Sequence, residues 1–193
     1  MQGEPEVAVL RLGHRPGRDE RMTTHVGLTA RALGADRAIL AGDASKSRGT
    51  VTDITDRFGG PFTVELTDSP KAVIRDWEGQ VVHLTMYGER VQDVEDEIRA
   101  AHRGERGGSA DSEGADGDPV LVVVGSQKVS FDVYEAADWN VGVTNQPHSE
   151  VAGLAVFLDR LFDGRELERE WEDADRTVIP KATGKKVVPT DEE

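Results

Sequence analysis

The stretch that most constrains the fold is residues 120–162, because it sets two short apolar runs and a long apolar helix close together in the chain. Residues 120–124 read VLVVV and stop at Gly125. A run this short and this rich in β-branched residues predicts a strand buried on both faces, as in parallel sheets. Residues 139–143 predict a second strand, and a polar turn over residues 144–149 leads from it into the helix.

That helix has a clear signal at each end. Ser149 can cap its first turn, Glu150 suits the positive end of the helix dipole, and Gly164 can end it. Its apolar positions form a wide stripe: Val151, Leu154, Ala155, Val156, Phe157, Leu158, Leu161 and Phe162. A stripe of this width predicts a helix buried on most sides, in the core or against a second subunit.

The rest of the chain alternates strand and helix patterns, which predicts an α/β fold with a mostly parallel sheet and helices on both faces. We expect strands at residues 7–12, 37–41, 62–66 and 81–84, and helices at residues 19–33, 51–58, 71–77 and 91–98. Residues 165–175 are acidic and predict a further helix. Residues 177–188 predict a short β-hairpin with a basic turn that carries Lys181, Lys185 and Lys186.

These patterns divide the chain into a domain over residues 1–164 and a C-terminal extension over residues 165–193. Within the domain, residues 104–118 read GERGGSADSEGADGD and hold no apolar residue larger than alanine. Such a segment has nothing to bury, so we expect a disordered acidic loop there.

Several classes of site are excluded by what the sequence lacks. Without cysteine there is no disulfide framework and no thiolate nucleophile. No phosphate-binding P-loop, dinucleotide-binding glycine motif or H-E-x-x-H motif is present, and the histidines are scattered, so we expect no metal. No segment is apolar enough to span a bilayer and no secretory signal pattern is present, so we expect a cytoplasmic protein without membrane contact.

The net charge of the chain allows two interpretations of whether the protein binds nucleic acid. The net charge is −14, with 19 Asp and 18 Glu against 17 Arg and only 6 Lys. Taken alone, such acidity favours a protein that does not meet nucleic acid, because phosphate contacts need Lys or Arg. However, lysine-poor acidic surfaces resemble those of proteins from halophilic archaea. At molar salt the Debye length is about 3 Å, so repulsion between this surface and RNA would be largely screened.

A run of short motifs in the right order gives the chain a family resemblance. They are LRLGHR at 10–15, RDxR at 18–21, TTHV at 23–26, ARA at 30–32, HLTMYG at 83–88 and NQPHSEVA at 145–152. With these motifs the chain resembles the archaeal tRNA ribose 2′-O-methyltransferases that modify cytidine 56 in the T-loop, a family of knotted SPOUT methyltransferases. The resemblance covers nearly the whole chain outside residues 104–118.

The resemblance implies a deep C-terminal trefoil knot, a homodimer, tRNA as the partner and S-adenosylmethionine as the cofactor. By position, the cofactor-binding residues would be Leu84, Gly125, Ser126, Gln127, Lys128, Val129, Val143, Thr144, Asn145, Gln146, Pro147, His148, Ser149 and Glu150. The strand pattern agrees, because ligands in open α/β sheets bind outside the carboxyl ends of the strands. Glycine at position 125 would let a ligand approach the backbone closely.

Related enzymes carry a proposed activating arginine in their first motif, and this chain departs from that pattern. If Gly34 is placed on the glycine that ends their helix, Leu28 falls where their arginine lies. The catalytic candidates are therefore Arg18, Arg21, His25 and Arg31. We place Arg21 first, because it lies in the matching RDxR block, together with His25. Each of these arginines could instead bind tRNA phosphates or pair with Asp19 or Glu20.

Two alternatives to this function stay open at the level of sequence. The first is a knotted methyltransferase that acts on another RNA, or on a base rather than a ribose. The second is a non-catalytic RNA-binding protein that keeps the same fold.

Overall fold

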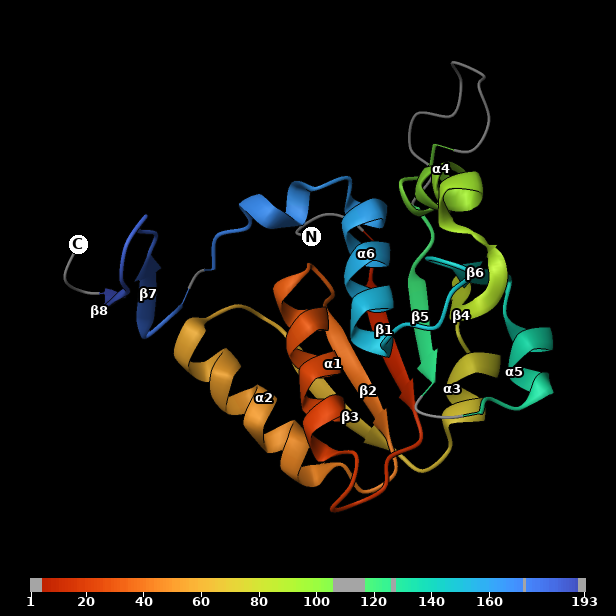
Figure 1. The fold of residues 1–193 in the computed structure, drawn as a ribbon, viewed down its shortest axis with the longest axis horizontal. Coiled ribbons are helices and arrows are strands. Elements are labelled where there is room, and N and C mark those ends of the chain that lie inside the picture. The colour runs from red at the N-terminus through yellow and green to blue at the C-terminus, as the bar shows by residue number, and fades with distance from the viewer. Residues whose placement is uncertain (1–4, 106–116, 126–127, 172, 191–193) are drawn as a thin grey trace.

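The structure, a computed structural model, describes residues 5–105, 117–125, 128–171 and 173–190. Its centre is a sheet of six parallel strands: β1 (Val7–Leu12), β2 (Arg37–Ala41), β3 (Thr63–Thr67), β4 (Gln80–Arg90), β5 (Val120–Gly125) and β6 (Trp139–Gly142). The strand order is β3-β2-β1-β5-β4-β6 (Figure 1). The parallel α/β fold is therefore confirmed, and the run at residues 120–124 is indeed a central strand with at most 1% exposure.

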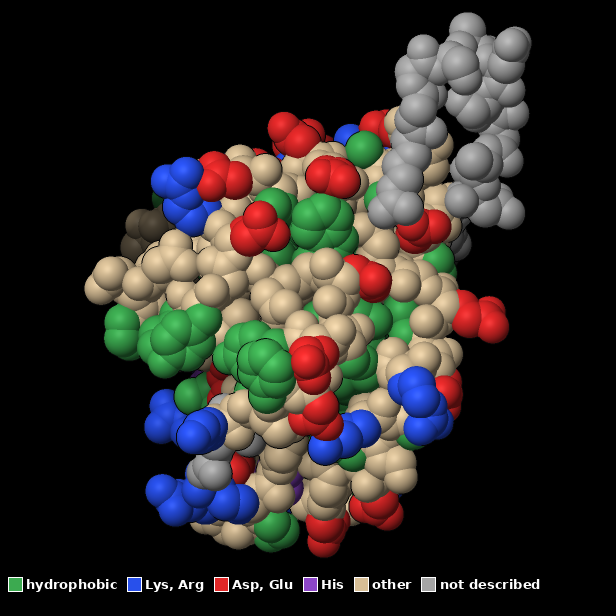
Figure 2. All heavy atoms as spheres, turned by 90° about the vertical axis from the view of Figure 1, so that its right-hand side faces the viewer, with side chains coloured by type: hydrophobic (Ala, Val, Ile, Leu, Met, Phe, Trp, Pro, Cys, Tyr) green, Lys and Arg blue, Asp and Glu red, His purple; other side chains and the backbone are tan. Residues whose placement is uncertain are grey.

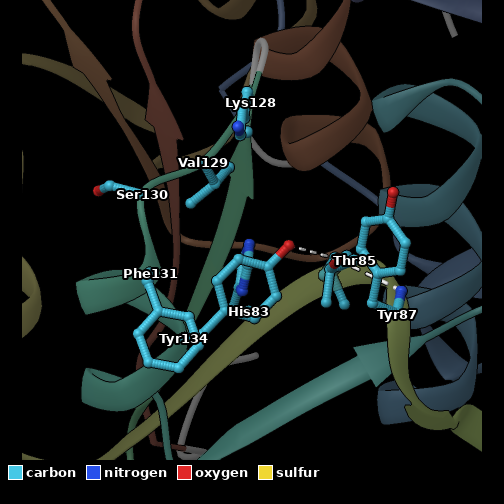
Figure 3. Close-up of a pocket in the computed structure, with 10 residues that line it drawn as sticks. His83, Thr85, Tyr87, Lys128, Val129, Ser130, Phe131 and Tyr134 are labelled. Carbon is cyan, nitrogen blue, oxygen red and sulfur yellow. Dashed lines mark hydrogen bonds between the residues drawn. The ribbon is translucent and has the colours of Figure 1, made fainter.

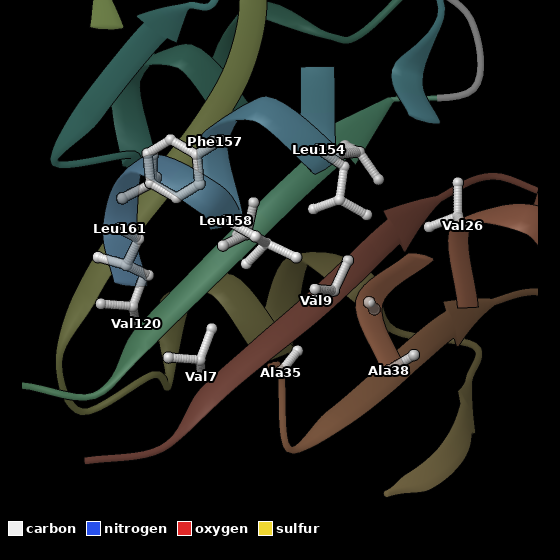
Figure 4. Close-up of a cluster of buried hydrophobic side chains, with 14 of the residues drawn as sticks. Val7, Val9, Val26, Ala35, Ala38, Val120, Leu154, Phe157, Leu158 and Leu161 are labelled. Atoms are coloured by element: carbon white, nitrogen blue, oxygen red, sulfur yellow. The ribbon is translucent and has the colours of Figure 1, made fainter. Parts of the chain in front are cut away.

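Helices cover both faces of the sheet. One face carries α1 (Glu20–Ala32), α2 (Ser45–Phe58), α4 (Val91–His102) and α6 (Glu150–Phe162). The other carries two short helices, α3 (Pro70–Arg75) and α5 (Phe131–Ala136). Alternation along β1 divides the core between the faces, since Val7 and Val9 pack with α6 while Ala8 and Leu10 pack with α3 and α5. Figure 4 shows the larger cluster, with Leu154 and Phe157 of α6 over the sheet.

The signals at the ends of α6 are confirmed. The Ser149 hydroxyl accepts a hydrogen bond from the Ala152 amide at 3.2 Å. At the other end, Asp163 and Gly164 adopt left-handed backbone conformations, with φ of 59° and 74°. The buried positions of α6 face the sheet, whereas Val156 stays 41% exposed. One side of the apolar stripe is therefore uncovered in a single chain.

Four elements differ from the prediction. Helix α2 begins at Ser45, before the predicted start at residue 51. Strand β4 runs on to Arg90, through a shift of register against β6 between Leu84 and Glu89. Helix α5 was not predicted, because its six residues are too few to show a helical period and it lacks the first-turn proline that marks the equally short α3. The predicted helix at residues 165–175 is wrong: the described residues of this range form a single helical turn, the 3₁₀ turn η1 (Arg165–Glu168).

The chain after η1 is held by one aromatic contact instead of by a helix. The Trp171 ring packs on Gly60 so closely that a Cβ at Gly60 would lie 1.9 Å from it. The guanidinium groups of Arg31 and Arg169 lie 4.7 and 4.4 Å from the ring centroid. This cation–π contact favours an extended path over a continued helix.

The predicted hairpin is confirmed as β7 (Arg176–Ile179) and β8 (Lys186–Pro189), an antiparallel pair with Thr177 opposite Val188. It contacts α2 and lies at the opposite end of the molecule from α5 (Figure 1).

The disordered loop predicted at residues 104–118 lies largely outside the described residues. The trefoil knot and the division of the chain at residue 164 stay predictions. No helix in the described ranges is long and apolar enough to cross a membrane.

Candidate active site

Two cavities open beside the carboxyl end of β5, the middle of β4 and the loop that follows β6. The larger, of about 650 Å³, lies on the α5 side of the sheet. The smaller, of about 220 Å³, lies toward the first turns of α6. Both are lined by Leu84, Thr85 and Gly125, so the end of β5 and the point at which β4 stops pairing with β5 form their common wall. This is the edge at which the sequence predicted a ligand.

A hydrogen-bonded group of side chains forms one wall of the larger cavity. The Tyr134 hydroxyl lies 3.0 Å from Thr85 Oγ1, and His83 Nδ1 lies 2.9 Å from Asn140 Oδ1. Figure 3 shows the Tyr134 ring beside His83, with its hydroxyl directed toward Thr85. Burial lowers the pKa of His83, and the hydrogen bond to Asn140 opposes that shift only in part. His83 is therefore a neutral imidazole at pH 7.

Exposed aromatic side chains stand at the rim of the larger cavity. Tyr87 and Phe131 line it and are 75% and 74% exposed, and Lys128 adds an exposed cation. The Phe131 and Tyr134 rings are nearly parallel, with centroids 6.4 Å apart. On this side of the molecule, hydrophobic side chains are exposed at several places across the face, with acidic and basic side chains between and around them (Figure 2). Such a rim suits a flat, partly apolar ligand.

The loop after β6 is tied to the far half of β4. The Asn145 side-chain amide donates to the carbonyls of Met86 at 2.9 Å and of Gly88 at 3.0 Å. At the start of α6, the His148 ring packs over Gly153, where a Cβ would lie 2.9 Å from it. The loop therefore closes over the smaller cavity in a defined position.

A buried ion pair borders the smaller cavity. Arg11, at the end of β1, is 2% exposed, and its Nη2 lies 3.0 Å from Glu150 Oε1. Burial raises the pKa of Glu150, while the charge of Arg11 and its hydrogen bond lower it. The pair joins the end of β1 to the first turn of α6.

The structure brings many of the predicted cofactor residues together. Leu84, Gly125, Lys128 and Val129 line the larger cavity, and Pro147, His148 and Glu150 join Leu84 and Gly125 at the smaller one. The other predicted residues of the loop after β6 line neither cavity: Val143, Thr144, Asn145, Gln146 and Ser149. Ser126 and Gln127 lie outside the described residues.

The predicted catalytic residues lie elsewhere, on α1. Arg21 and His25 are one turn apart and exposed, and no α1 residue lines either cavity. Arg21 forms no ion pair or side-chain hydrogen bond with the part of the chain that the structure describes. His25 instead lines an open apolar hollow of about 390 Å³ between α1 and α6. A single chain therefore does not bring its own Arg21 to either of the two cavities.

The turn before α1 is well ordered by side-chain contacts. Arg15 Nε lies 2.8 Å from Asp19 Oδ2, and the hydrogen bond from Arg15 lowers the pKa of Asp19 to about 2. His14 Nδ1 lies 2.8 Å from Thr23 Oγ1. These contacts fix the N-terminal turn of α1, on which Arg21 stands.

Arg31 can be removed from the catalytic candidates. It is 7% exposed, and it donates to Thr55 Oγ1 at 3.1 Å and to the Gly59 carbonyl at 2.6 Å. Its guanidinium also stacks on Trp171, far along the chain from the strand ends. Its role is to hold α2 and the C-terminal extension.

Sequence reasoning missed the residues on the α5 side of the larger cavity, namely His83, Thr85, Tyr87, Phe131 and Tyr134. The available signal was His83, a polar residue inside the apolar run at residues 81–84. In the described residues, no group of three or more His, Asp or Glu side chains is placed to hold a metal ion.

Comparison with known proteins places this site in a family. The family described as "tRNA ribose 2'-O-methyltransferase, aTrm56" matches residues 58–188. Proteins named tRNA (cytidine(56)-2'-O)-methyltransferase are similar over the full length: that of Natronomonas pharaonis is 71% identical with all of both chains covered. That of Thermococcus kodakarensis is 49% identical, with 94% of this chain and 96% of the relative covered.

Solved structures share the fold at low sequence identity. The SpoU methyltransferase AviRb from Streptomyces viridochromogenes, solved with AdoMet, superposes with a TM-score of 0.53 at 16% identity, covering 84% of this chain and 58% of its own. The A. aeolicus TrmH/SpoU tRNA modifying enzyme gives 0.53 at 14% identity, covering 86% and 77%. With its parallel sheet, its strand-end cavities and relatives of this identity, the chain belongs to the archaeal tRNA ribose 2′-O-methyltransferase family.

Proposed function

We propose that this protein methylates the ribose 2′-hydroxyl of cytidine 56 in the T-loop of tRNA, with S-adenosylmethionine as the methyl donor, as a cytoplasmic homodimer. The observation that carries the proposal is the convergence of three strand-end loops on two adjoining cavities. Family membership supplies the reaction and the substrate.

The residues around the cavities fit the cofactor. A volume of about 650 Å³ is within the usual range for small-molecule sites. Strand ends at Leu84 and Gly125 can offer backbone donors and acceptors, and Gly125 leaves their approach open. When bound, the cofactor supplies a methyl group on a sulfonium, so the protein has to place the 2′-oxygen in line with that group.

We assign activation of the 2′-hydroxyl to Arg21, with His25 beside it. An exposed guanidinium without a partner in the described chain can donate hydrogen bonds to the 2′-oxygen as negative charge develops there. His25, four residues later on the same face of α1, carries an imidazole that can accept a proton.

The apolar hollow between α1 and α6 supports the proposal that a second copy of the chain supplies Arg21 and His25 to the site. It is lined by His25, Leu28, Thr29, Ala32, Leu33, Val151 and Ala155. Met22 and Val156 on the same two helices are 37% and 41% exposed. Two copies packed through this apolar face would bury it and bring α1 of one chain toward the strand ends of the other.

The proposed function is tested by nucleoside analysis of unmodified tRNA transcript after incubation with S-adenosylmethionine. We expect 2′-O-methylcytidine, lost when cytidine 56 is replaced by uridine in the transcript. A different methylated nucleoside would identify an enzyme with another target. RNA binding without any methylation would identify a non-catalytic RNA-binding protein.

A further inference from the structure

His83 is the most deeply buried polar residue of the larger cavity. It lies on β4 between β5 and β6, opposite Val123 and Asn140, and its exposed fraction is 0%. Its side chain is on the α5 face, since Val81, two residues earlier, packs in the core of that face. Figure 3 shows its ring among the residues that line the cavity.

The contacts of Asn140 fix which nitrogen of His83 carries the proton. The Asn140 side-chain nitrogen faces the Tyr134 carbonyl at 2.9 Å, and a carbonyl can only accept. Asn140 Oδ1 must then accept from His83 Nδ1, which lies 2.9 Å away and carries the hydrogen. In a neutral imidazole, the other nitrogen, Nε2, is left with a lone pair.

That lone pair has no partner among the described residues, and Nε2 is buried. The neighbouring Tyr134 side chain does not supply one. The Tyr134 ring packs edge-on against the imidazole, with centroids 4.6 Å apart, while its hydroxyl bonds to Thr85. His83 lines the cavity, and an acceptor that is fixed, buried and unpaired beside that cavity is costly unless a ligand provides the donor.

We propose that His83 Nε2 accepts a hydrogen bond from the exocyclic amino group of the cofactor's adenine and selects for it. The inference rests on the proposed function, because it requires the cofactor to occupy this cavity. The 6-amino group is the only hydrogen-bond donor on the adenine ring. Leu84, Gly125 and Val129 line the same cavity, and the Phe131 and Tyr134 rings offer flat surfaces to a base.

The test is calorimetry with two ligands, S-adenosylhomocysteine and its analogue with purine riboside in place of adenosine, which lacks only the amino group. We expect the wild-type protein to bind the analogue about ten-fold more weakly or worse. His83→Leu removes the acceptor, so we expect it to bind both ligands with nearly equal affinity. His83→Gln can place an amide oxygen near the position of Nε2, and we expect it to retain part of the discrimination.

Each outcome separates the inference from the proposed function. Equal binding of the two ligands by the wild-type protein would overturn the proposed role of His83. This comparison uses the wild-type protein alone, so it does not depend on whether the variants fold. A second result would also overturn the inference: wild type and His83→Leu bind S-adenosylhomocysteine alike, and the variant has a higher KM for tRNA. The donor to His83 Nε2 would then be the amino group of the target cytosine instead of that of adenine. A wild-type protein that binds neither ligand would overturn the proposed function itself.

Discussion

Arg11 and Glu150 are 139 residues apart in the chain and form an ion pair at the edge of the smaller cavity. Their side chains are 2% and 15% exposed, and Arg11 also donates to the Gly13 carbonyl at 2.5 Å. Buried pairs add little net stability over an apolar substitute, but leaving one charge alone is costly. The pair thus fixes the position of the α6 N-terminus relative to β1.

This gives a prediction for Arg11→Leu. At pH 8 the variant leaves the Glu150 carboxylate buried without its cation, and we expect a loss of about 3 kcal/mol, the low end for buried pairs because Glu150 is partly exposed. Burial already raises the pKa of Glu150, so as the pH falls through that pKa the carboxyl becomes neutral and the loss shrinks. Urea unfolding at pH 8 and pH 5, at fixed salt, measures both values. An equal loss of unfolding free energy at both pH values would contradict this account. The double variant Arg11→Leu/Glu150→Gln is the control, and we expect its stability loss not to depend on pH in this range.

Gly125 carries a second prediction at the scale of a residue. It lines both cavities at the end of β5, so a side chain there would project into the space assigned to the cofactor. We expect Gly125→Val to lose measurable binding of S-adenosylhomocysteine by calorimetry and to keep the wild-type circular dichroism spectrum. Unchanged affinity would take the β5 loop out of the site.

At the scale of elements, the hairpin β7–β8 is held by few contacts of its own. An isolated two-stranded hairpin is marginal in water, and Val178 and Val187 are 58% and 49% exposed. Trp171 anchors the chain just before it, between Arg31 and Arg169 on the surface of Gly60. The hairpin is thereby presented to the solvent with its basic turn, far from α5 (Figure 1).

We expect this turn to contact tRNA. Replacing Lys181, Lys185 and Lys186 with Gln should weaken tRNA binding and flatten its dependence on salt, because each lost phosphate contact removes roughly 0.9 from the slope of log K against log salt. Binding of S-adenosylhomocysteine should not change. Filter binding across a salt series provides the measurement, and the exposed Lys46→Gln on α2 is the matched control. An unchanged slope in the triple variant would contradict the contact.

How far the sequence predicts these elements depends on the range of the interactions that form them. Ser149 and Gly164 mark the ends of α6 because caps are local signals. The charged run after Gly164 was wrongly predicted to be a helix. Its path depends on the contact of Trp171 with Gly60, which is distant in the sequence. The strand-end loops were predictable, whereas Tyr134 and His83 meet only because β4 lies between β5 and β6. Neighbours of that kind cannot be read from spacing along the chain.

At the scale of the whole molecule, an acidic protein has to hold a polyanion. The net charge of −14 repels tRNA at long range, while three of the six lysines lie at the hairpin and a fourth, Lys128, lines the larger cavity. Salt screens the long-range repulsion from the distant acidic groups, while each direct phosphate contact also weakens as the salt concentration rises. The relatives from Natronomonas pharaonis and Haloarcula marismortui are 71% and 66% identical over this whole length. The same balance of charge would then serve a protein adapted to high salt.

The last prediction concerns how two chains form one site. Arg21 stands on α1, the two cavities that we assign to the cofactor lie beside β4 and the end of β5, and no α1 residue lines them within one chain. The exposed apolar hollow between α1 and α6 is the surface through which a second copy can supply its arginine. We therefore expect Arg21→Ala and Gly125→Val homodimers to be inactive for different reasons.

Mixing these two variants distinguishes a shared site from a site within one chain. After joint unfolding and refolding, about half of the dimers are mixed, and each mixed dimer has one site with both an intact Arg21 and an intact cofactor loop. We expect methyl transfer to recover to roughly a quarter of the wild-type rate, with subunit exchange verified by native mass spectrometry. Refolding each variant alone is the control and should give no activity. Exchange without recovery would mean that each site is built from one chain, or that Arg21 is not part of it.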